Sequence, residues 1–346
     1  MSGLIDEYRH IPVLLDECIE LLCVREGDVF VDATLGGAGH SLHVAPLLGA
    51  SGLLLGIDQD DMALSVARER LENLGCVDNL LGDALIGSQP SISHEESDMP
   101  VSNMPRYELL RGNFGCLDDL LLSACVPGID AILFDIGVSS VQIDTPERGF
   151  SFKRNAPLDM RMSPNSQTLT AEHIVNTYSE AELTRIFREY GEEKWATRIA
   201  QFVCKWREST PIETSAQLVD VIKAAIPASA RRRGGHPAKR VFQALRIEVN
   251  GELDALSRAL EAALRWLNPR GRLAVISYHS LEDRIVKETF ASFANRCTCP
   301  PDMPVCACGR EPVLRLITRK PILPSVEEIE RNPRSRSAKL RVAQKI

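Results

Sequence analysis

The sequence lacks an apolar run of the roughly 18 residues that a membrane span requires. Its first residues, Met-Ser-Gly-Leu-Ile-Asp-Glu, have neither the basic flank nor the apolar stretch of a secretory signal. An excess of positive charge is also absent, because the formal net charge is -7 at pH 7. We therefore expect a cytoplasmic protein without membrane contact, in which any binding of nucleic acid depends on local clusters of Lys and Arg.

A disulfide framework is lacking as well, since all but four of the ten cysteines are scattered along the chain. With 346 residues, of which 44% are hydrophobic and 25% charged, the composition is that of an ordinary globular protein. The length predicts two domains, or one domain with a large insertion.

The hydrophobic pattern predicts an α/β fold with an inserted helical domain. Up to about residue 135, short apolar runs alternate with helical periodicity, which is typical of a parallel sheet covered by helices. Helical patterns alone follow, and the α/β pattern then returns. Strands are expected at Val29–Asp32, at Leu53–Ile57, around Leu109 and Leu110, at Ile129–Phe134 and at Leu273–Ser277. We expect one α/β domain from residues 1–144 and 241–346, interrupted by an all-α domain at 145–240.

Local signals add three expectations. The runs Ser-Glu-Ala-Glu at 179–182 and Thr-Ser-Ala-Gln at 214–217 are capping boxes that begin helices. Apolar residues from Val249 to Leu267 recur in steps of four and three, which predicts one continuous helix. Serine, proline, glutamate and asparagine dominate residues 88–105, which predicts a solvated loop.

A glycine-rich turn follows the first expected strand. The run Asp32–His40 reads Asp-Ala-Thr-Leu-Gly-Gly-Ala-Gly-His, and its glycines let the backbone approach a ligand at the start of a helix. A dinucleotide fingerprint requires Gly-x-Gly-x-x-Gly, but Leu42 stands in the last place, and no Gly-Lys-Ser/Thr run is present for a triphosphate. Plain turn geometry is the alternative for the glycines alone.

An acidic residue ends the second expected strand. Asp58 stands where a carboxylate accepts both hydroxyl groups of a ribose. Combined with a glycine turn that lacks phosphate-binding features, Asp58 favours S-adenosylmethionine over NAD as the cofactor. The alternative for Asp58 alone is a helix cap, because Asp60 and Asp61 follow.

Further polar groups follow the fourth and fifth expected strands. Asp135 comes after four apolar residues, at the edge where open α/β folds bind ligands. Gln142 is either a ligand contact or a surface glutamine. Phe150 or Phe152 would stack on a base, and arginines and lysines nearby would clamp RNA phosphates. The phosphate-binding candidates are Arg161, Lys239, Arg240, Arg246 and Arg284. A solvated or ion-paired side chain is the alternative for each of them.

Several of these runs together resemble the MraW/RsmH family. The matching runs include Tyr8-Arg-His-Ile-Pro-Val-Leu-Leu15, Gly-Gly-Ala-Gly-His, Phe-Asp-Ile-Gly-Val-Ser-Ser, Pro-Leu-Asp-Met-Arg-Met, His-Ser-Leu-Glu-Asp-Arg and Asn332-Pro-Arg-Ser-Arg-Ser-Ala-Lys-Leu-Arg341. The resemblance implies a Rossmann-like S-adenosylmethionine-dependent methyltransferase sheet with an inserted all-α domain. It also implies methylation of the N4 amine of cytidine 1402 in the decoding region of 16S ribosomal RNA.

The resemblance also assigns site residues. It implies that Ala38, Gly39 and His40 contact the methionine part of the cofactor, that Asp58 binds the ribose and that Phe114 lies near the adenine. Asp135 and Gln142 match the remaining cofactor contacts of the family. The substrate would be the small ribosomal subunit or a late assembly intermediate, with no role for DNA. Departures from the family pattern are Ala38, Ala156 and Val241, and Ala156 would stiffen a substrate loop.

The remaining cysteines form a cluster that is not part of the general family pattern. The two Cys-x-Cys pairs are Cys297 with Cys299 and Cys306 with Cys308. They resemble a variant segment of actinobacterial members and have the ligands for a closed tetrahedral zinc site. Reduced thiols in a surface loop are the alternative. A basic segment from Arg331 to Lys345 then closes the chain and is expected to be a basic C-terminal tail.

The residue that receives the proton of the target amine is left open by the sequence. An acceptor facing the N–H would help this weak nucleophile to react, and the candidates are Asp135, Asp159, Asp283 and His279. Three other functions compete. Leu42 disfavours a nicotinamide-dependent oxidoreductase, and a DNA amino-methyltransferase would show a Pro-Pro-aromatic run after Asp135. A non-catalytic RNA-binding assembly factor would need neither the glycine turn nor Asp58.

Overall fold

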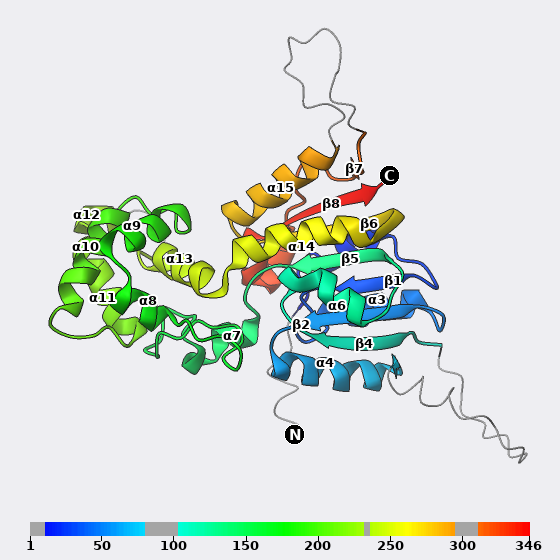
Figure 1. Ribbon diagram of the computed structural model, residues 1–346, viewed down its shortest axis with the longest axis horizontal. Coiled ribbons are helices and arrows are strands. Elements are labelled where there is room, and N and C mark those ends of the chain that lie inside the picture. Colours follow the sequence, from blue (N-terminus) through cyan, green and yellow to red (C-terminus); the bar gives the residue numbers. More distant parts are fainter. Residues whose placement is uncertain (1–10, 80–102, 232–235, 295–310) are drawn as a thin grey trace, which may run out of the picture. The chain divides into compact units, whose positions relative to one another are not determined.

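The computed structural model describes residues 11–79, 103–231, 236–294 and 311–346. The chain forms two compact units, one made of residues 1–137 and 254–346 and the other of residues 138–253 (Figure 1). The sequence places the boundaries at 144/145 and 240/241, so the first boundary lies earlier in the structure and the second lies later. The Cys297–Cys308 cluster and most of the expected loop at 88–105 lie outside the described residues.

The first unit is built on one sheet of eight strands among the described residues (Figure 1). In the order β3-β4-β2-β1-β5-β6-β8-β7, neighbouring strands are parallel from β3 to β6, whereas β8 is antiparallel to both β6 and β7. The strands are β1 Val29–Asp32, β2 Leu53–Asp58, β3 Val77–Asp78, β4 Arg106–Arg111, β5 Ile129–Asp135, β6 Leu267–Ser277, β7 Leu314–Leu316 and β8 Lys339–Lys345. The chain order reverses between β1 and β5, and ligands bind at such a switch point in Rossmann-like folds.

Helices cover both faces of this sheet, because alternate residues of each buried strand point to opposite faces. Ile132 and Phe134 of β5 belong to a core that α6, α14 and α15 complete. Ala131 and Leu133 belong to the core on the other face, with α2, α3 and α4. The helices of this unit are α2 Leu15–Leu22, α3 Gly39–Leu48, α4 Asp61–Leu74, η1 Phe114–Cys116, α6 Leu117–Ser123, α14 Glu252–Trp266, α15 Ser280–Ala294, α16 Val326–Arg331 and η3 Pro333–Ser337. The α/β fold expected from the sequence is confirmed.

The second unit is helical, with its own apolar core. The capping boxes expected at 179–182 and 214–217 are present, with reciprocal side-chain and backbone bonds at the starts of α9 and α11. The helices are α7 Ser140–Asp144, η2 Pro146–Arg148, α8 Ala171–Thr177, α9 Glu180–Glu189, α10 Ala196–Arg207, α11 Ser215–Ala225, α12 Ala228–Arg231 and α13 Lys239–Asn250.

One helix expected from the sequence is in fact two. Gly251 has a φ of +58° and ends α13, and α14 begins at Glu252. The prediction of one helix from Val249 to Leu267 is therefore wrong. The apolar spacing continues across the break, so periodicity alone does not reveal it. Asn250 fixes the end of α13 within the helical unit, since its side chain bonds the backbone of Met160 and Met162.

The basic C-terminal segment is not a solvated tail. Its last part is strand β8, in which Leu340, Val342 and Ala343 are buried against the sheet. Lys345 donates to the carbonyl oxygens of Leu264 and Leu267 at 2.9 and 2.6 Å. The alternation of basic and apolar residues is the pattern of a strand, and several of the basic side chains stabilise the fold.

Among the described residues, no helix has both the length and the apolar character that crossing a membrane demands.

Candidate functional site

The glycine turn joins β1 to α3 in a strained conformation. Gly36 and Ala38 have φ values of +50° and +61°, and Ala38 is fully buried at the start of α3. Arg70 of α4 donates to the Gly37 carbonyl at 2.6 Å. A Cβ atom on Gly39 would lie 3.0 Å from the Pro12 ring, so a side chain fits there only if the ring shifts. The turn is thus held on both sides, with its backbone close to the ends of the strands.

Asp32 anchors this turn from below. Its Oδ2 accepts a hydrogen bond of 2.7 Å from the Ser41 hydroxyl, and its Oδ1 accepts one of 3.3 Å from the Thr34 N–H. Burial raises the pKa of Asp32, although the hydrogen bonds from the Ser41 hydroxyl and the Thr34 N–H oppose that rise. The sequence indicated Asp32 only as the start of the turn, because the bond to Ser41 forms only when α3 packs next to the end of β1.

Asp58 stands at the carboxyl end of β2, next to β1. Its Oδ2 accepts the Gly36 N–H at 2.8 Å, and its Oδ1 accepts the Asp60 N–H at 2.9 Å. Burial raises the pKa of Asp58 to about 6 despite these two bonds, which favour the charged form. Asp60, and not Asp58, caps α4 through the Met62 N–H at 3.1 Å. The helix-cap alternative for Asp58 is therefore excluded.

The loop after β4 lies beside Asp58. The Gly112 N–H donates to the Asp58 carbonyl at 2.9 Å, and the Asn113 amide donates to the Gln59 side chain at 3.3 Å. Asn113 also caps the short helix η1, which begins with Phe114. The Phe114 ring is partly exposed and meets the Phe134 ring edge to face at 6.0 Å. A partly exposed aromatic ring thus stands in the loop whose backbone bonds the end of β2.

Asp135 ends β5 at the switch point and lies next to three other side chains. Its N–H donates to the Thr34 hydroxyl at 2.6 Å, and its Oδ1 accepts from the Tyr278 hydroxyl at 2.7 Å. Its Oδ2 lies 3.9 Å from Nδ1 of the buried His40. Burial, together with the nearby charge of Asp135, raises the pKa of Tyr278 well above its usual range, so this phenol remains a donor.

The tautomer of His40 follows from its second ring nitrogen. His40 Nε2 lies 3.0 Å from the Val13 carbonyl, which only accepts hydrogen bonds, so Nε2 carries the proton. In the neutral ring, Nδ1 then accepts. Nδ1 and Asp135 Oδ2 are then two acceptors, which cannot bond each other, and a donor placed between them would satisfy both.

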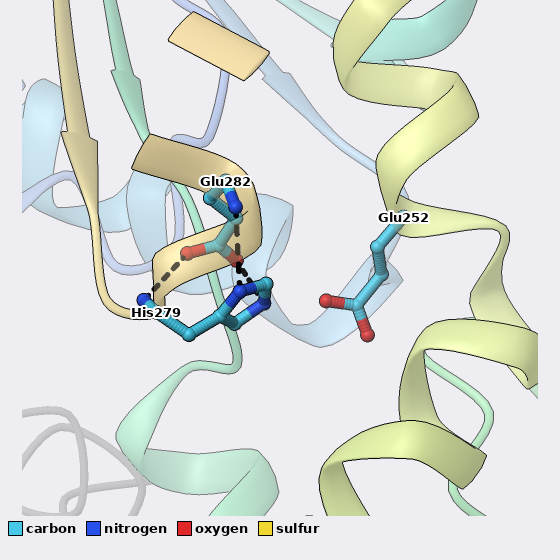
Figure 2. Close-up of side chains that lie close together, drawn as sticks. All are labelled: Glu252, His279 and Glu282. Atoms are coloured by element: carbon cyan, nitrogen blue, oxygen red, sulfur yellow. Dashed lines mark hydrogen bonds and ion pairs between the residues drawn. The ribbon is translucent and has the colours of Figure 1, made fainter. Parts of the chain in front are cut away.

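His279 directly precedes α15 and contacts Glu282 of that helix (Figure 2). Glu282 is 1% exposed, and its Oε2 accepts the N–H groups of Tyr278 and His279 at 2.8 and 3.1 Å. His279 Nε2 lies 2.9 Å from Glu282 Oε1. The ring of His279 is thus turned toward its own helix. The Glu252 carboxylate, also labelled in Figure 2, accepts two bonds of 2.7 Å from Arg246.

Asp283 forms an ion pair that ties α15 to β8. Arg341 Nε and Lys339 Nζ donate to its two oxygens at 2.7 and 3.1 Å. Burial acts to raise the pKa of Asp283, but the bonds from Arg341 and Lys339 outweigh it and leave that pKa below its ordinary value. This candidate acceptor is therefore already neutralised by two cations.

An Asp283→Asn variant should lower the free energy of unfolding by roughly 3 kcal/mol, because it leaves Arg341, which is 8% exposed, without its counter-charge. Since the pKa is lowered in the folded state, this stabilisation is present above about pH 4 and is lost as the pH falls below the ordinary value. Urea unfolding at neutral pH measures it. Asp61→Asn, which removes an exposed pair with Arg111, is the control and should cost less than about 1 kcal/mol. Equal costs would contradict the prediction.

The other candidates lie in the helical unit. Arg161 donates to both oxygens of Asp159 at 2.6 and 2.9 Å and to the carbonyls of Pro164 and Gln167. Burial acts to raise the pKa of Asp159, but the Arg161 bonds outweigh it and lower that pKa. Gln142 is buried, and its Oε1 accepts the Ser139 N–H at 3.1 Å at the start of α7.

The RNA-binding candidates fall into two groups. Arg161 and Arg246 form ion pairs with the carboxylates of Asp159 and Glu252, which was the alternative to RNA binding given for these residues. Lys239 and Arg240 are exposed at the start of α13, although Arg240 also donates to the Glu192 carbonyl at 3.0 Å. Arg284 is exposed on α15 in the sheet unit.

An aromatic stack lies near the start of α13. Phe152 meets the buried ring of Phe242 edge to face at 5.8 Å, and its ring stacks on His236 with centroids 4.5 Å apart. His236 is exposed. Burial lowers the pKa of His236, and the charges of Lys223 and Lys153 add to this effect. The His236 ring is thus an exposed imidazole whose pKa lies below its ordinary value.

Comparison with known families gives one match over both units. The model of the "MraW methylase family" matches residues 7–81 and 91–346. The chain is 50% identical over 339 residues to Ribosomal RNA small subunit methyltransferase H of Symbiobacterium thermophilum, covering 98% of this chain and 97% of that protein. It is 51% identical over 341 residues to the protein of the same name from Heliobacterium mobile, covering 98% and 100%. These organisms do not bear out the actinobacterial expectation.

Solved structures resemble the chain more distantly. A structure titled as a putative rRNA-methylase from Clostridium thermocellum is 13% identical, with a TM-score of 0.41, over 96% of this chain and 95% of that one.

Proposed function

The chain belongs to the MraW methylase family, and from this premise we propose that it methylates the N4 amine of cytidine 1402 in the decoding region of 16S ribosomal RNA. S-adenosylmethionine is its methyl donor. The observation that carries the proposal is the extent of the family match, which includes both the sheet unit and the helical unit. Relatives that match nearly the whole chain are named as small-subunit ribosomal RNA methyltransferases.

The residues at the carboxyl ends of β1 and β2 suit the nucleoside part of the cofactor. Each Asp58 oxygen accepts one backbone N–H and keeps a lone pair for a ribose hydroxyl. The partly exposed Phe114 ring offers a face for the adenine. The hydrogen bond from the Gly36 N–H fixes the Asp58 carboxylate next to the glycine turn. The groups that would hold the ribose and the methionine part of the cofactor are therefore linked to each other.

Cofactor affinity should depend on pH through Asp58. Only the ionised carboxylate accepts both ribose hydroxyls, and the pKa of Asp58 is about 6. We expect the affinity for S-adenosylmethionine to be steady above about pH 7 and to fall toward tenfold per unit as the pH drops below about 6. Calorimetric titration across this range measures it. An Asp58→Asn variant should show no such slope, and an equal slope in both proteins would assign the titration to another group.

The pair of acceptors at the switch point suits the methionine end. An ammonium group between His40 Nδ1 and Asp135 Oδ2 would donate a hydrogen bond to each. Gln142, which the family resemblance assigned to the cofactor, is proposed as a weaker contact because its amide oxygen already accepts the Ser139 N–H at the start of α7.

Transfer requires alignment and a proton acceptor. The bound cofactor supplies a methyl group made electrophilic by the sulfonium. The rigid turn and Asp58 hold the donor in place, which is how a displacement of this kind gains most of its rate. Among the candidate acceptors, Asp159 and Asp283 are paired with arginine, and His279 is turned to Glu282. We therefore assign the role to Asp135, whose carboxylate has further lone pairs beyond those facing Tyr278 and His40.

The helical unit and α15 are proposed to bind the RNA. Lys239 and Arg240 would contact phosphates directly, with Arg284 doing so from the sheet unit. Arg161 and Arg246 would shape substrate loops through their carboxylate partners. Because the net charge is negative, such local contacts require a substrate of matching shape, which favours a small subunit or a late assembly intermediate. For the same reason we propose a cytoplasmic location.

The test is the modification itself. Small-subunit RNA from cells with and without this protein is digested and examined by mass spectrometry for N4-methylated cytidine at position 1402. Loss of the mark in the deletion strain, restored by the intact gene, supports the proposal, and an unchanged mark contradicts it. A non-catalytic assembly factor is distinguished by titration, since it would give no heat with S-adenosylmethionine.

A further inference from the structure

We infer that Tyr278 is a positioning residue for methyl transfer and that it acts through Asp135. This inference rests on the proposed function. The Tyr278 hydroxyl donates to Asp135 Oδ1 at 2.7 Å, across 143 residues of sequence. Neither the sequence motifs nor the family resemblance had singled out this tyrosine, which lies between β6 and α15.

The position of Tyr278 is itself fixed by a buried acid. Glu282 Oε2 accepts the Tyr278 N–H at 2.8 Å and the His279 N–H at 3.1 Å, so the turn after β6 is closed onto the first turn of α15. The Tyr278 ring lies over Gly137, where a Cβ atom would come within 3.5 Å of Cδ2. Backbone and ring are therefore both held, and the hydroxyl reaches Asp135 without freedom to turn away.

The bond from Tyr278 gives the two oxygens of the Asp135 carboxylate different roles. Oδ1 is oriented by a phenol that remains protonated, and Oδ2 is left to face His40. Without the hydroxyl, the carboxylate would turn about its Cβ–Cγ bond, and its remaining lone pairs would no longer be fixed toward the donor and the amine. Tyr278 thus orients an acceptor and needs no contact with the substrate.

The direct test is Tyr278→Phe, which keeps the ring and removes the hydroxyl. We expect the single-turnover rate at saturating S-adenosylmethionine to fall about tenfold and the cofactor affinity about fivefold, the loss of one hydrogen bond to a charged group. The KM for small subunits should stay within about twofold. The matched control is Tyr107→Phe, which removes a bond of 3.0 Å from a fully buried tyrosine to Glu72 near the opposite end of the sheet. It should leave the rate unchanged.

A double variant shows whether the effect passes through Asp135. If it does, Tyr278→Phe added to Asp135→Asn slows transfer no further than Asp135→Asn alone. The inference is overturned if the two losses of rate multiply in the double variant. It is also overturned if Tyr278→Phe transfers at the normal rate, or if Tyr107→Phe loses as much rate as Tyr278→Phe. A failure of the proposed function is distinguishable, because the wild-type protein would then leave small subunits unmethylated. The role of Tyr278 would still be tested in that case by the affinity of Tyr278→Phe for S-adenosylmethionine.

Discussion

An Asp58→Asn variant is expected to bind S-adenosylmethionine about 100-fold more weakly than the wild type at pH 7.5 or above, where Asp58 is ionised. The Asp58 carboxylate has enough lone pairs to accept two hydroxyls at once while also accepting the Gly36 and Asp60 N–H groups. An amide has one oxygen, and its NH₂ would face one of these donors. The loss therefore combines a weaker ribose contact with a less well-held turn. Calorimetric titration measures it directly.

A nearby acid provides the control for this variant. Asp61 begins α4 three positions further on, and its exposed carboxylate pairs with Arg111. Asp61→Asn should leave cofactor affinity within about twofold of the wild type. Thermal unfolding without cofactor shows whether either variant has lost its fold. A folded Asp58→Asn protein that binds the cofactor normally would remove Asp58 from the site, and the ribose assignment with it.

The sequence predicted the parts of the fold that local patterns encode. The five expected strands correspond to β1, β2, β4, β5 and β6, because buried parallel strands are short continuous apolar runs. Strands β3 and β7 were missed, since two or three residues carry no periodic signal. Strand β8 was missed because its basic residues suggested a basic C-terminal tail, and its antiparallel pairing with β6, which buries Leu340 and Val342, is a tertiary contact.

The site was predicted to a similar extent. Asp58 and Asp135 were selected as candidates because a carboxylate directly after an apolar strand is conspicuous in the sequence. The groups that hydrogen-bond the candidate residues could not be predicted, since they come from distant segments of the chain. The Tyr278 hydroxyl, the Val13 carbonyl that sets the His40 tautomer, and Arg341 beside Asp283 all depend on tertiary contacts. The candidate acceptors could therefore be named from the sequence but not ranked.

Asp135→Asn should slow methyl transfer about 100-fold or more in single turnovers at saturating S-adenosylmethionine, because the amide cannot take up the proton of the target amine. Asp159→Asn and Asp283→Asn should stay within about threefold of the wild-type rate, since their carboxylates are neutralised by arginine.

Asp130→Asn is the matched control for this comparison. Asp130 lies near the start of the same strand, β5, and accepts hydrogen bonds from the Val29 N–H and the Asn268 amide at 2.9 and 2.8 Å. We expect Asp130→Asn to lower the stability of the fold without changing the rate of methyl transfer. Saturation with cofactor separates the acceptor role from binding, because a residue that only binds the ammonium recovers its full rate when the site is filled. A normal rate in Asp135→Asn under those conditions would restrict Asp135 to cofactor binding. Normal rates in all the candidate variants would instead mean that alignment alone drives the transfer and that water receives the proton.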